Sequence, residues 1–335
     1  MTTKIAVMGA GSWGTALAQV LCENNHEVMM YDLNQEIISD INTNHKNSLF
    51  FKDQPLPKSL KATVNLKEAL EGADVVLLSV PTKVIRFVLK DIHAVLNHPV
   101  TIVNASKGIE PVTHKRVSEI VAEEIDVDKL SAFVALSGPS HAEEVMVKDL
   151  TTITCASTVS SKATEIQALF NTQYFRVYST DDLIGVEIGG SIKNVIALAA
   201  GILAGLGYGD NAKAALITRG LVEIKRLGTA MGGKEETFGG LSGLGDLIVT
   251  CTSVHSRNWQ AGYSIGSGSN LKEALDKMTM VVEGVRTCEA TYQLAKERHI
   301  EMPIVETVYE VIFNHLEPKI AIERLMSREI KPEFY

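Results

Sequence analysis

The feature that most constrains the fold is a glycine-rich turn between two regular segments near the N-terminus. Residues 9–14, with the sequence GAGSWG, follow the apolar run of residues 5–8. They also open a segment with helical periodicity, residues 15–22, and Asp32 ends a second apolar run, residues 28–31. This order of strand, glycine turn, helix and acidic residue is typical of a unit that binds a dinucleotide.

Each glycine of the turn has a separate physical task. Gly9 permits the tight turn, Gly11 lets a pyrophosphate approach the backbone, and Gly14 lets the helix pack closely on the strand. The first N–H groups of the helix are then available to phosphate oxygens. The carboxylate of Asp32 can accept hydrogen bonds from a ribose. The alternative is a glycine turn in another kind of α/β protein, and the presence of Asp32 argues against it.

The length and charge of the chain limit its architecture and its partners. With 335 residues it is long enough for two domains, each with its own hydrophobic core. Its formal net charge of −8 argues against nucleic acids and acidic membranes as the main partners. We therefore expect a small-molecule ligand.

Cysteine spacing and hydropathy point to the cytoplasm. The four cysteines are scattered without a C-x-x-C pair, so they predict neither a zinc site nor a disulfide framework. The first predicted strand starts at Lys4 and leaves no room for a signal peptide. The most apolar stretch, residues 195–206, is too short to span a bilayer. We expect a cytoplasmic protein with no stable membrane insertion and no metal site.

Strand-like and helix-like segments alternate in the first half of the chain. Continuous apolar runs such as residues 74–80 are typical of a mainly parallel sheet with both faces covered. The alternation predicts a doubly wound α/β, Rossmann-like domain over residues 1–180. Because ligands bind beyond the carboxyl ends of such strands, the residues after each run are site candidates. The further strand-like runs are residues 63–64, 101–104, 132–136, 152–155 and 175–178.

The pattern changes after residue 180, where strand-like runs disappear and apolar residues recur with the helical period. This change predicts an all-α domain over residues 181–335. Residues 45–60, which contain Pro55 and Pro57, are expected to form a long loop, either a surface excursion or a mobile flap. The helix-like segments are residues 195–206, 212–231, 271–278, 287–296, 305–313 and 320–326.

Two strand ends in the first half carry residues suited to a ligand cleft. In residues 104–108, Lys107 either brings an ammonium to a phosphate or carbonyl oxygen, or is an exposed lysine on a turn. At the next strand end, Gly138 allows close approach of a ligand and Ser140 supplies a hydroxyl. His141 beside them is either an acid–base group or a bystander in the loop.

The only charged residue between Glu187 and Asp210 is Lys193, in an otherwise apolar helical segment. A lysine there is either at the surface or desolvated, and desolvation favours the neutral amine. Because a neutral amine can take up a proton at neutral pH, we favour a functional role for Lys193. Gly189 and Gly190 either interrupt the helix or thin it, and they would let a flat ligand approach its backbone.

Glycines are concentrated in residues 239–247, where they are costly in backbone entropy for a helical domain. We expect close packing there against a ligand or against the other domain. Asp246 in this segment is either a functional residue or a helix cap. Shortly afterwards Ser256, Arg257 and Asn258 place a hydroxyl, a guanidinium and an amide side by side, which suits a phosphate. A surface salt bridge is the alternative for Arg257.

Together these segments resemble the NAD(P)-dependent glycerol-3-phosphate dehydrogenase family of the bacterial type. The similar motifs occur in the order typical of that family and cover nearly the whole chain. They are GAGSWGTALA (9–18), NASKGIE (104–110), SGPSHAEEV (137–145), GGSIKNVIALAAGI (189–202), GLSGLGDLIVTCTS (240–253), HSRN (255–258) and VVEGVRT (281–287).

The resemblance implies reversible hydride transfer between dihydroxyacetone phosphate and sn-glycerol 3-phosphate, with NAD or NADP, for phospholipid synthesis. It implies that Lys193 moves the proton of the C2 hydroxyl, and that Lys107 and Arg257 contact both substrate and cofactor. It also implies a homodimer through the helical domain. The other implied substrate residues are Gly138, Ser140, Asp246, Ser256 and Asn258, and the other implied cofactor residues are Ser12, Trp13, Ala142, Val281 and Glu283.

Two features depart from the pattern of that family. Leu33 and Asn34 follow Asp32, so no Arg or Lys stands there to receive the 2′-phosphate of NADP, and the sequence favours NAD. Residues 47–57 lack the Tyr-Leu-Pro turn that is common in relatives, so the contacts of that flap do not carry over.

Two other functions stay open from the residues alone. A dehydrogenase of hydroxy acids, as in the 6-phosphogluconate dehydrogenase superfamily, also combines a Rossmann domain, an all-α domain and a lysine. Residues 256–258, which follow Asp246 closely, argue against it because they suit a small phosphate ester. A redox sensor that only binds NAD(H) is the second alternative, and the presence of both Lys193 and Asn194 argues against it.

Overall fold

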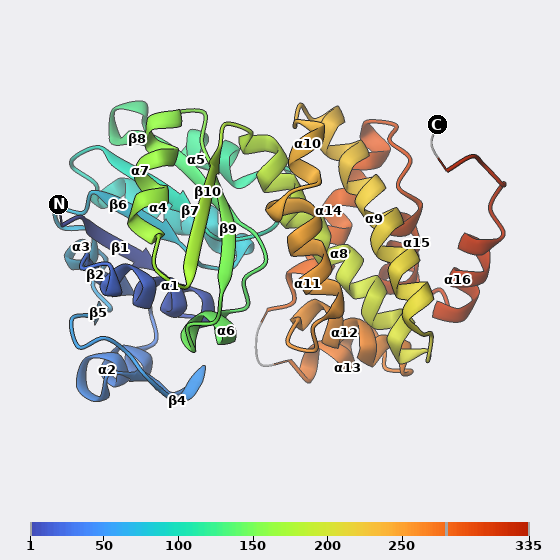
Figure 1. Ribbon diagram of the computed structural model, residues 1–335, viewed down its shortest axis with the longest axis horizontal. Helices are drawn as coiled ribbons and strands as arrows, with labels where there is room; N and C mark the ends of the chain where they lie inside the picture. Colours follow the sequence, from blue (N-terminus) through green and yellow to red (C-terminus); the bar gives the residue numbers. More distant parts are fainter. Residues whose placement is uncertain (1, 279–280, 334–335) are drawn as a thin grey trace.

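A mainly parallel sheet makes up the first part of the protein, and helices make up the second (Figure 1). The computed structural model describes residues 2–278 and 281–333. The strands of the large sheet are β1 (Lys4–Met8), β2 (Glu27–Tyr31), β5 (Lys61–Thr63), β6 (Val75–Leu78), β7 (Val100–Asn104), β8 (Leu130–Ser137), β9 (Thr151–Ala156) and β10 (Phe175–Thr180).

The order of strands in this sheet is β10-β9-β8-β7-β6-β1-β2-β5. Neighbouring strands are parallel except for β8 and β9, which are antiparallel. The chain therefore starts at a central strand and crosses over to both sides of it, which is the doubly wound arrangement. The predicted fold class is confirmed, with β9 and β10 running antiparallel to the other strands of the sheet.

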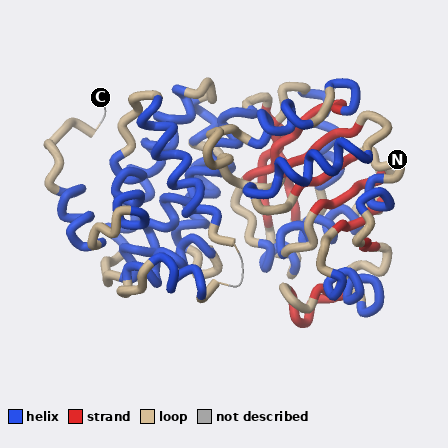
Figure 2. Tube along the Cα trace, turned by 180° about the vertical axis from the view of Figure 1, so that it is seen from behind, coloured by secondary structure: helices blue, strands red, loops and turns tan. Residues whose placement is uncertain are grey.

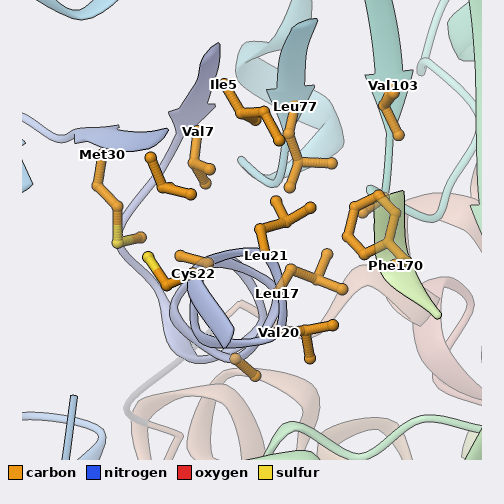
Figure 3. Packing of buried hydrophobic residues seen from close by; sticks show 14 of the residues in the cluster. Ile5, Val7, Leu17, Val20, Leu21, Cys22, Met30, Leu77, Val103 and Phe170 are labelled. Carbon is orange, nitrogen blue, oxygen red and sulfur yellow. The ribbon is translucent and has the colours of Figure 1, made fainter. Parts of the chain in front are cut away.

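Helix α1 (Ser12–Glu23) packs on the central strands and stands in the middle of the first hydrophobic core. Leu17, Val20 and Leu21 are fully buried, because residues three and four apart share one face of a helix. In Figure 3 this face of α1 lies against Val7 of β1 and Leu77 of β6. The packing holds the start of α1 close to the end of β1.

Helices cover both faces of the sheet, as Figures 1 and 2 show from opposite sides. The core on one face includes side chains of α1, α2 (Gln35–Asn44) and α7 (Ser160–Phe170). The core on the other face includes side chains of α3 (Leu66–Leu70), α4 (Ile85–Val95) and α5 (Val117–Glu124). Burial on both faces explains the continuous apolar runs of the strands.

The second part of the protein surrounds a central helix, α8 (Leu183–Gly205). Within the described residues, α8 is the one helix long and apolar enough to cross a membrane, yet 83% of that stretch is buried inside the protein, as in a core helix. The other helices of this part are α9 (Asp210–Ala230), α10 (Glu235–Phe238), α11 (Asp246–Thr252), α12 (Arg257–Gly266), α13 (Leu271–Asp276), α14 (Glu283–Glu297), α15 (Pro303–Phe313) and α16 (Pro318–Met326).

The expectation of a loop over residues 45–60 is wrong in part. This segment contains a small antiparallel pair, β3 (Lys46–Asn47) and β4 (Phe51–Pro55). The buried amide of Asn47 donates hydrogen bonds to the Ala10 carbonyl (2.9 Å) and to the hydroxyl of Thr15 (2.9 Å). The hairpin is thus tied to the glycine turn, because a buried polar side chain needs partners.

Candidate active site

The glycine turn has the geometry that a pyrophosphate needs. Gly9 adopts a φ of +103°, which side chains disfavour, and a Cβ on Gly14 would lie 2.2 Å from the Gly9 carbonyl oxygen. A Cβ on Gly11, by contrast, would meet no atom within 4 Å. Helix α1 begins directly after Gly11, so the N–H groups of its first turn lie beside this open space.

Asp32 lies against the same turn, at the end of β2. Its Oδ2 accepts a hydrogen bond from the backbone N–H of Ala10 at 2.8 Å, and its Oδ1 accepts one from the N–H of Asn34 at 2.9 Å. A carboxylate has about four lone-pair positions, so acceptor capacity remains for ribose hydroxyls. The turn, the start of α1 and Asp32 together fit the adenosine half of a dinucleotide.

A cluster of two lysines and one carboxylate lies where the sheet meets the helical part. Lys193 of α8 donates hydrogen bonds to Oδ1 of Asp246 and to the hydroxyl of Thr250 (2.8 Å). Lys107, in the loop after β7, donates to Oδ2 of the same carboxylate (2.7 Å) and to the Gly138 carbonyl (3.1 Å). Asp246 therefore bridges the two lysines.

Burial and the neighbouring charges together set the protonation of this cluster. Lys193 is 6% exposed, and this burial together with the charge of Lys107 lowers the pKa of Lys193 to about 7, although Asp246 opposes the change. Burial alone would raise the pKa of Asp246, but Lys107 and Lys193 outweigh it and hold that pKa below its usual value. The cluster thus pairs a permanent carboxylate with an amine that exchanges protons near neutral pH.

The glycines of α8 do not serve the purpose expected from the sequence. Helix α8 runs through Gly189 and Gly190 without a break. A Cβ on Gly189 would lie 2.7 Å from the Ser242 carbonyl oxygen, and one on Gly190 would lie 2.4 Å from the hydroxyl of Ser137. These glycines let protein, rather than a flat ligand, approach the helix, and they bring β8 and residues 241–245, just before α11, close to α8.

The segment of residues 256–258 is built into the start of α12. The hydroxyl of Ser256 accepts the N–H of Trp259 at 3.3 Å and caps the helix. The buried amide of Asn258 donates to the side-chain oxygen of Asn194 (2.9 Å) and accepts the N–H of Gly284 (2.8 Å). Asn258 therefore joins α12 to α8 and α14, whereas Arg257 between them is exposed.

The remaining predicted residues come from both parts of the protein, the sheet part and the helical part. The hydroxyl of Ser140 donates to the Gly138 carbonyl at 2.9 Å, close to Lys107. Glu283 begins α14 and accepts the backbone N–H of Thr82, beyond the end of β6, at 3.2 Å. The others lie at element starts and in a loop: Ser12 and Trp13 open α1, Ala142 opens α6 (Ala142–Met146), and the half-buried Val281 precedes α14.

Two family models match the chain, one on each side of residue 180. Residues 4–163 match the N-terminus of NAD-dependent glycerol-3-phosphate dehydrogenase, and residues 182–323 match its C-terminus. The chain belongs to the NAD-dependent glycerol-3-phosphate dehydrogenase family.

Relatives in this family are similar over almost their whole length. The glycerol-3-phosphate dehydrogenase [NAD(P)+] of Geobacillus kaustophilus is 57% identical over 98% of this chain and 96% of its own. That of an Exiguobacterium species is 55% identical over 98% and 97%. A crystal structure of glycerol-3-phosphate dehydrogenase from Coxiella burnetii, at 37% identity, has a TM-score of 0.93 and covers 98% of this chain and 99% of that one. The family resemblance expected from the motifs is confirmed, and the chain is an oxidoreductase of the NAD(P)-dependent kind.

Sequence reasoning missed two residues at the centre of this glycerol-3-phosphate dehydrogenase site. Thr250 receives a hydrogen bond from Lys193 and donates one to the Asp246 carbonyl at 2.6 Å. The hydroxyl of Ser137 lies 3.4 Å from Oδ2 of Asp246. The spacing of Asp246 and Thr250, four residues apart in a helix, was the available signal, since such residues share a face. Ser137 directly follows the strand-like run of residues 132–136, so its place at a strand end was the available signal.

Proposed function

We propose that this chain reversibly reduces dihydroxyacetone phosphate to sn-glycerol 3-phosphate, with Lys193 as the group that moves the C2 proton. The observation that carries this proposal is the buried Lys193 ammonium, held by Asp246 and Thr250 with a pKa lowered to about 7. A group with a pKa near the working pH transfers protons most effectively in either direction.

Lys193 and Lys107 have different tasks at the C2 oxygen of the substrate. In reduction, protonated Lys193 donates its proton to the oxygen as negative charge develops there, and in oxidation the neutral amine removes that proton. The ammonium of Lys107, fixed by Asp246 and the Gly138 carbonyl, stabilises the same developing charge. When bound, the nicotinamide donates or accepts the hydride at C2.

The remaining substrate contacts come from both parts of the chain. We assign Gly138, Ser140, Asp246, Ser256 and Asn258 to the lining of the substrate site, and Arg257 to the substrate phosphate and the cofactor. A guanidinium presents two parallel donors to phosphate oxygens, which suits this task. This phosphate contact separates the proposal from a dehydrogenase of hydroxy acids.

The cofactor would lie along the turn at the carboxyl ends of β1 and β2. We assign Gly9, Gly11, Ser12, Trp13 and Gly14 to its pyrophosphate side, and Asp32 to its ribose. On the nicotinamide side the assigned residues are Lys107, Ala142, Arg257, Val281 and Glu283. The open space at Gly11 supports this placement.

We further propose that the enzyme prefers NAD to NADP. A 2′-phosphate on the ribose would lie beside the carboxylate of Asp32, and like charges repel. We expect a higher kcat/KM with NADH than with NADPH. The variant Leu33→Arg, at a side chain that is 81% exposed, should improve kcat/KM with NADPH by adding a cation beside Asp32. Equal efficiency of the unaltered enzyme with both cofactors would remove this preference.

The test of the catalytic role is Lys193→Ala, measured in dihydroxyacetone phosphate reduction. We expect kcat to fall by about 10²- to 10⁴-fold, the usual loss of general acid–base help, with the Kd for NADH unchanged. The matched control is Lys213→Ala, at a surface lysine of α9 that pairs with Asp210. A kcat for Lys193→Ala close to that of the control would show that another group moves the proton. No turnover by the unaltered enzyme would instead favour the sensor hypothesis.

We infer that the chain is organised as residues 1–180 and 181–335, and that it acts in the cytoplasm to supply phospholipid synthesis. We also infer a homodimer formed through the helical part. A groove of about 1050 Å³ between α9, α15 and α16 supports such an interface, because apolar side chains such as Ile202, Leu216 and Val308 line it. None of the residues assigned to the active site lies on that groove. Light scattering would give the mass in solution, and a monomer would overturn the dimer.

A further inference from the structure

Two histidines from different parts of the chain face each other beside the active site. His141 follows β8 and stands immediately before α6. His255 lies between α11 and α12, next to the residues assigned to substrate binding. Their ring centroids are 6.2 Å apart, and the ring planes make an angle of 63°. None of the roles given above uses either ring.

His141 has a buried nitrogen without a partner. Its Nε2 is shielded from solvent and makes no hydrogen bond within the protein. Buried polar atoms in native proteins are almost always satisfied, so an exception points to a water or a ligand. In the sequence, His141 stands between Ser140 and Ala142, which are assigned to substrate and cofactor, so its unpartnered nitrogen is a candidate ligand contact of the same site.

The charges around His141 indicate which part of a ligand this nitrogen meets. The groups that act on it are Lys193 and Lys107, which favour the neutral ring, and Glu143 and Glu144, which favour the charged one. Burial has the largest effect, and the pKa of His141 is lowered from its ordinary value. Glu143 also acts on Arg257, so one carboxylate influences both His141 and the proposed phosphate-binding guanidinium.

The proposed function separates the C2 oxygen of the substrate from its phosphate. The C2 oxygen of the substrate is served by Lys193 and Lys107, which share Asp246 between them. The proposed function assigns the substrate phosphate to Arg257, apart from this cluster. A neutral imidazole beside the phosphate donates a hydrogen bond to a phosphate oxygen. The bound dianion then favours the protonated ring.

We propose that His141 is a specificity-determining residue that binds the phosphate group of the substrate through Nε2, with the ring of His255 packed against it. The ligand class is a phosphate monoester dianion. The inference rests on the proposed function, because it places the same substrate in the same cleft. It adds proton uptake from solvent on substrate binding, which Arg257 alone does not produce because its guanidinium stays charged.

The first test compares His141→Phe and His141→Asn with the control His299→Asn, at an exposed histidine after α14. We expect the phenylalanine variant to raise the KM for dihydroxyacetone phosphate by about 10- to 100-fold, the usual worth of a hydrogen bond to a charged group. The asparagine variant, which keeps a donor, should recover part of the loss. The KM for NADH should not change, and kcat should fall far less than the KM rises.

The pH dependence provides a readout that a purely structural role would not move. In the unaltered enzyme, protonation of His141 strengthens phosphate binding as the pH falls, and His141→Phe should lose this component of the KM profile. An unchanged KM for dihydroxyacetone phosphate in His141→Phe would overturn the proposal. An equal rise in the KM for NADH would also overturn it, because His141 would then contact the cofactor.

A second measurement separates this inference from the proposed function. Calorimetric titration with sn-glycerol 3-phosphate and with inorganic phosphate needs no turnover. If the unaltered protein binds either anion but catalyses nothing, and His141→Phe weakens binding about 10-fold or more, the inference stands while the proposed function fails. If Arg257→Ala weakens anion binding and His141→Phe does not, the inference is wrong and the proposed function is untouched.

Discussion

Replacing Asp246 by asparagine should move the pH at which this enzyme works. The carboxylate is fully buried and bridges Lys193 and Lys107, with its Oδ2 2.7 Å from the Lys107 nitrogen. Asparagine keeps the shape of the side chain but removes the charge that opposes the lowering of the Lys193 pKa. We therefore expect the pKa of Lys193 to fall below about 7, so that the ammonium becomes a stronger but rarer acid.

Coulomb's law sets the size of the change. Two unit charges about 4 Å apart at an effective dielectric constant of about 20 interact by about 4 kcal/mol. This corresponds to about a 1000-fold change in the protonation equilibrium, or up to about three pH units in the inflection of the rate profile. In reduction, the stronger acid compensates only in part for its lower population. In oxidation, the neutral amine is a weaker base. The rate at pH 7 should therefore fall by at least about tenfold in both directions.

The assay is the initial rate of NADH oxidation with saturating dihydroxyacetone phosphate between pH 5.5 and 8.5. In the unaltered enzyme kcat for reduction should fall as the pH rises through about 7, because protonated Lys193 is the proton donor. In Asp246→Asn this inflection should lie at lower pH, so that kcat for reduction already falls from the acid end of this range upward. The matched control is Asp210→Asn, whose side chain is 97% exposed and pairs with Lys213. A folded Asp246→Asn enzyme with an unmoved or more alkaline inflection would refute the reasoning.

Three further changes test other parts of the structure. Arg257→Ala should raise the KM for dihydroxyacetone phosphate by about 10- to 100-fold, and an unchanged KM would place the phosphate elsewhere. Gly14→Ala should abolish NADH binding, measured by fluorescence titration, because its Cβ would lie 2.2 Å from the Gly9 carbonyl oxygen. Burial raises the pKa of Glu223 to about 7, so the native state holds that proton more tightly than the unfolded state, and stability should fall as the pH rises from about 4.5 to 7. Thermal melts of Glu223→Gln should lack this loss of stability with rising pH. A pH dependence identical to that of the unaltered protein would contradict the raised pKa of Glu223.

Local patterns predicted the strands and the first helix well. The apolar runs before the glycine turn and around residues 75–78 became β1 and β6, because buried parallel strands need apolar residues on both faces. Lys193 in its apolar segment was expected to be desolvated or at the surface, and it is buried. These features depend on neighbours in the chain, which a sequence shows directly.

Contacts between distant segments were harder to predict. Residues 45–60 suggested a loop because of Pro55 and Pro57, yet Asn47 of that segment binds the carbonyl of Ala10 and the hydroxyl of Thr15. Gly189 and Gly190 suggested room for a ligand, but their neighbours are protein atoms of other elements. Which atoms fill a given space depends on how the helices and strands pack against each other. The composition of a single segment does not predict that packing.

By itself, the sequence determined that the chain carries a dinucleotide turn, an α/β part followed by helices, and a solitary lysine in an apolar helix. Only the tertiary structure brought Lys107 to Asp246, 139 residues later, and Asp246 to Lys193, 53 residues before it. That encounter sets the pKa of Lys193, because a pKa depends on burial and on charges nearby in space rather than on adjacent residues. The sequence shows which residue types are present, whereas the protonation of Lys193 and Asp246 depends on the fold.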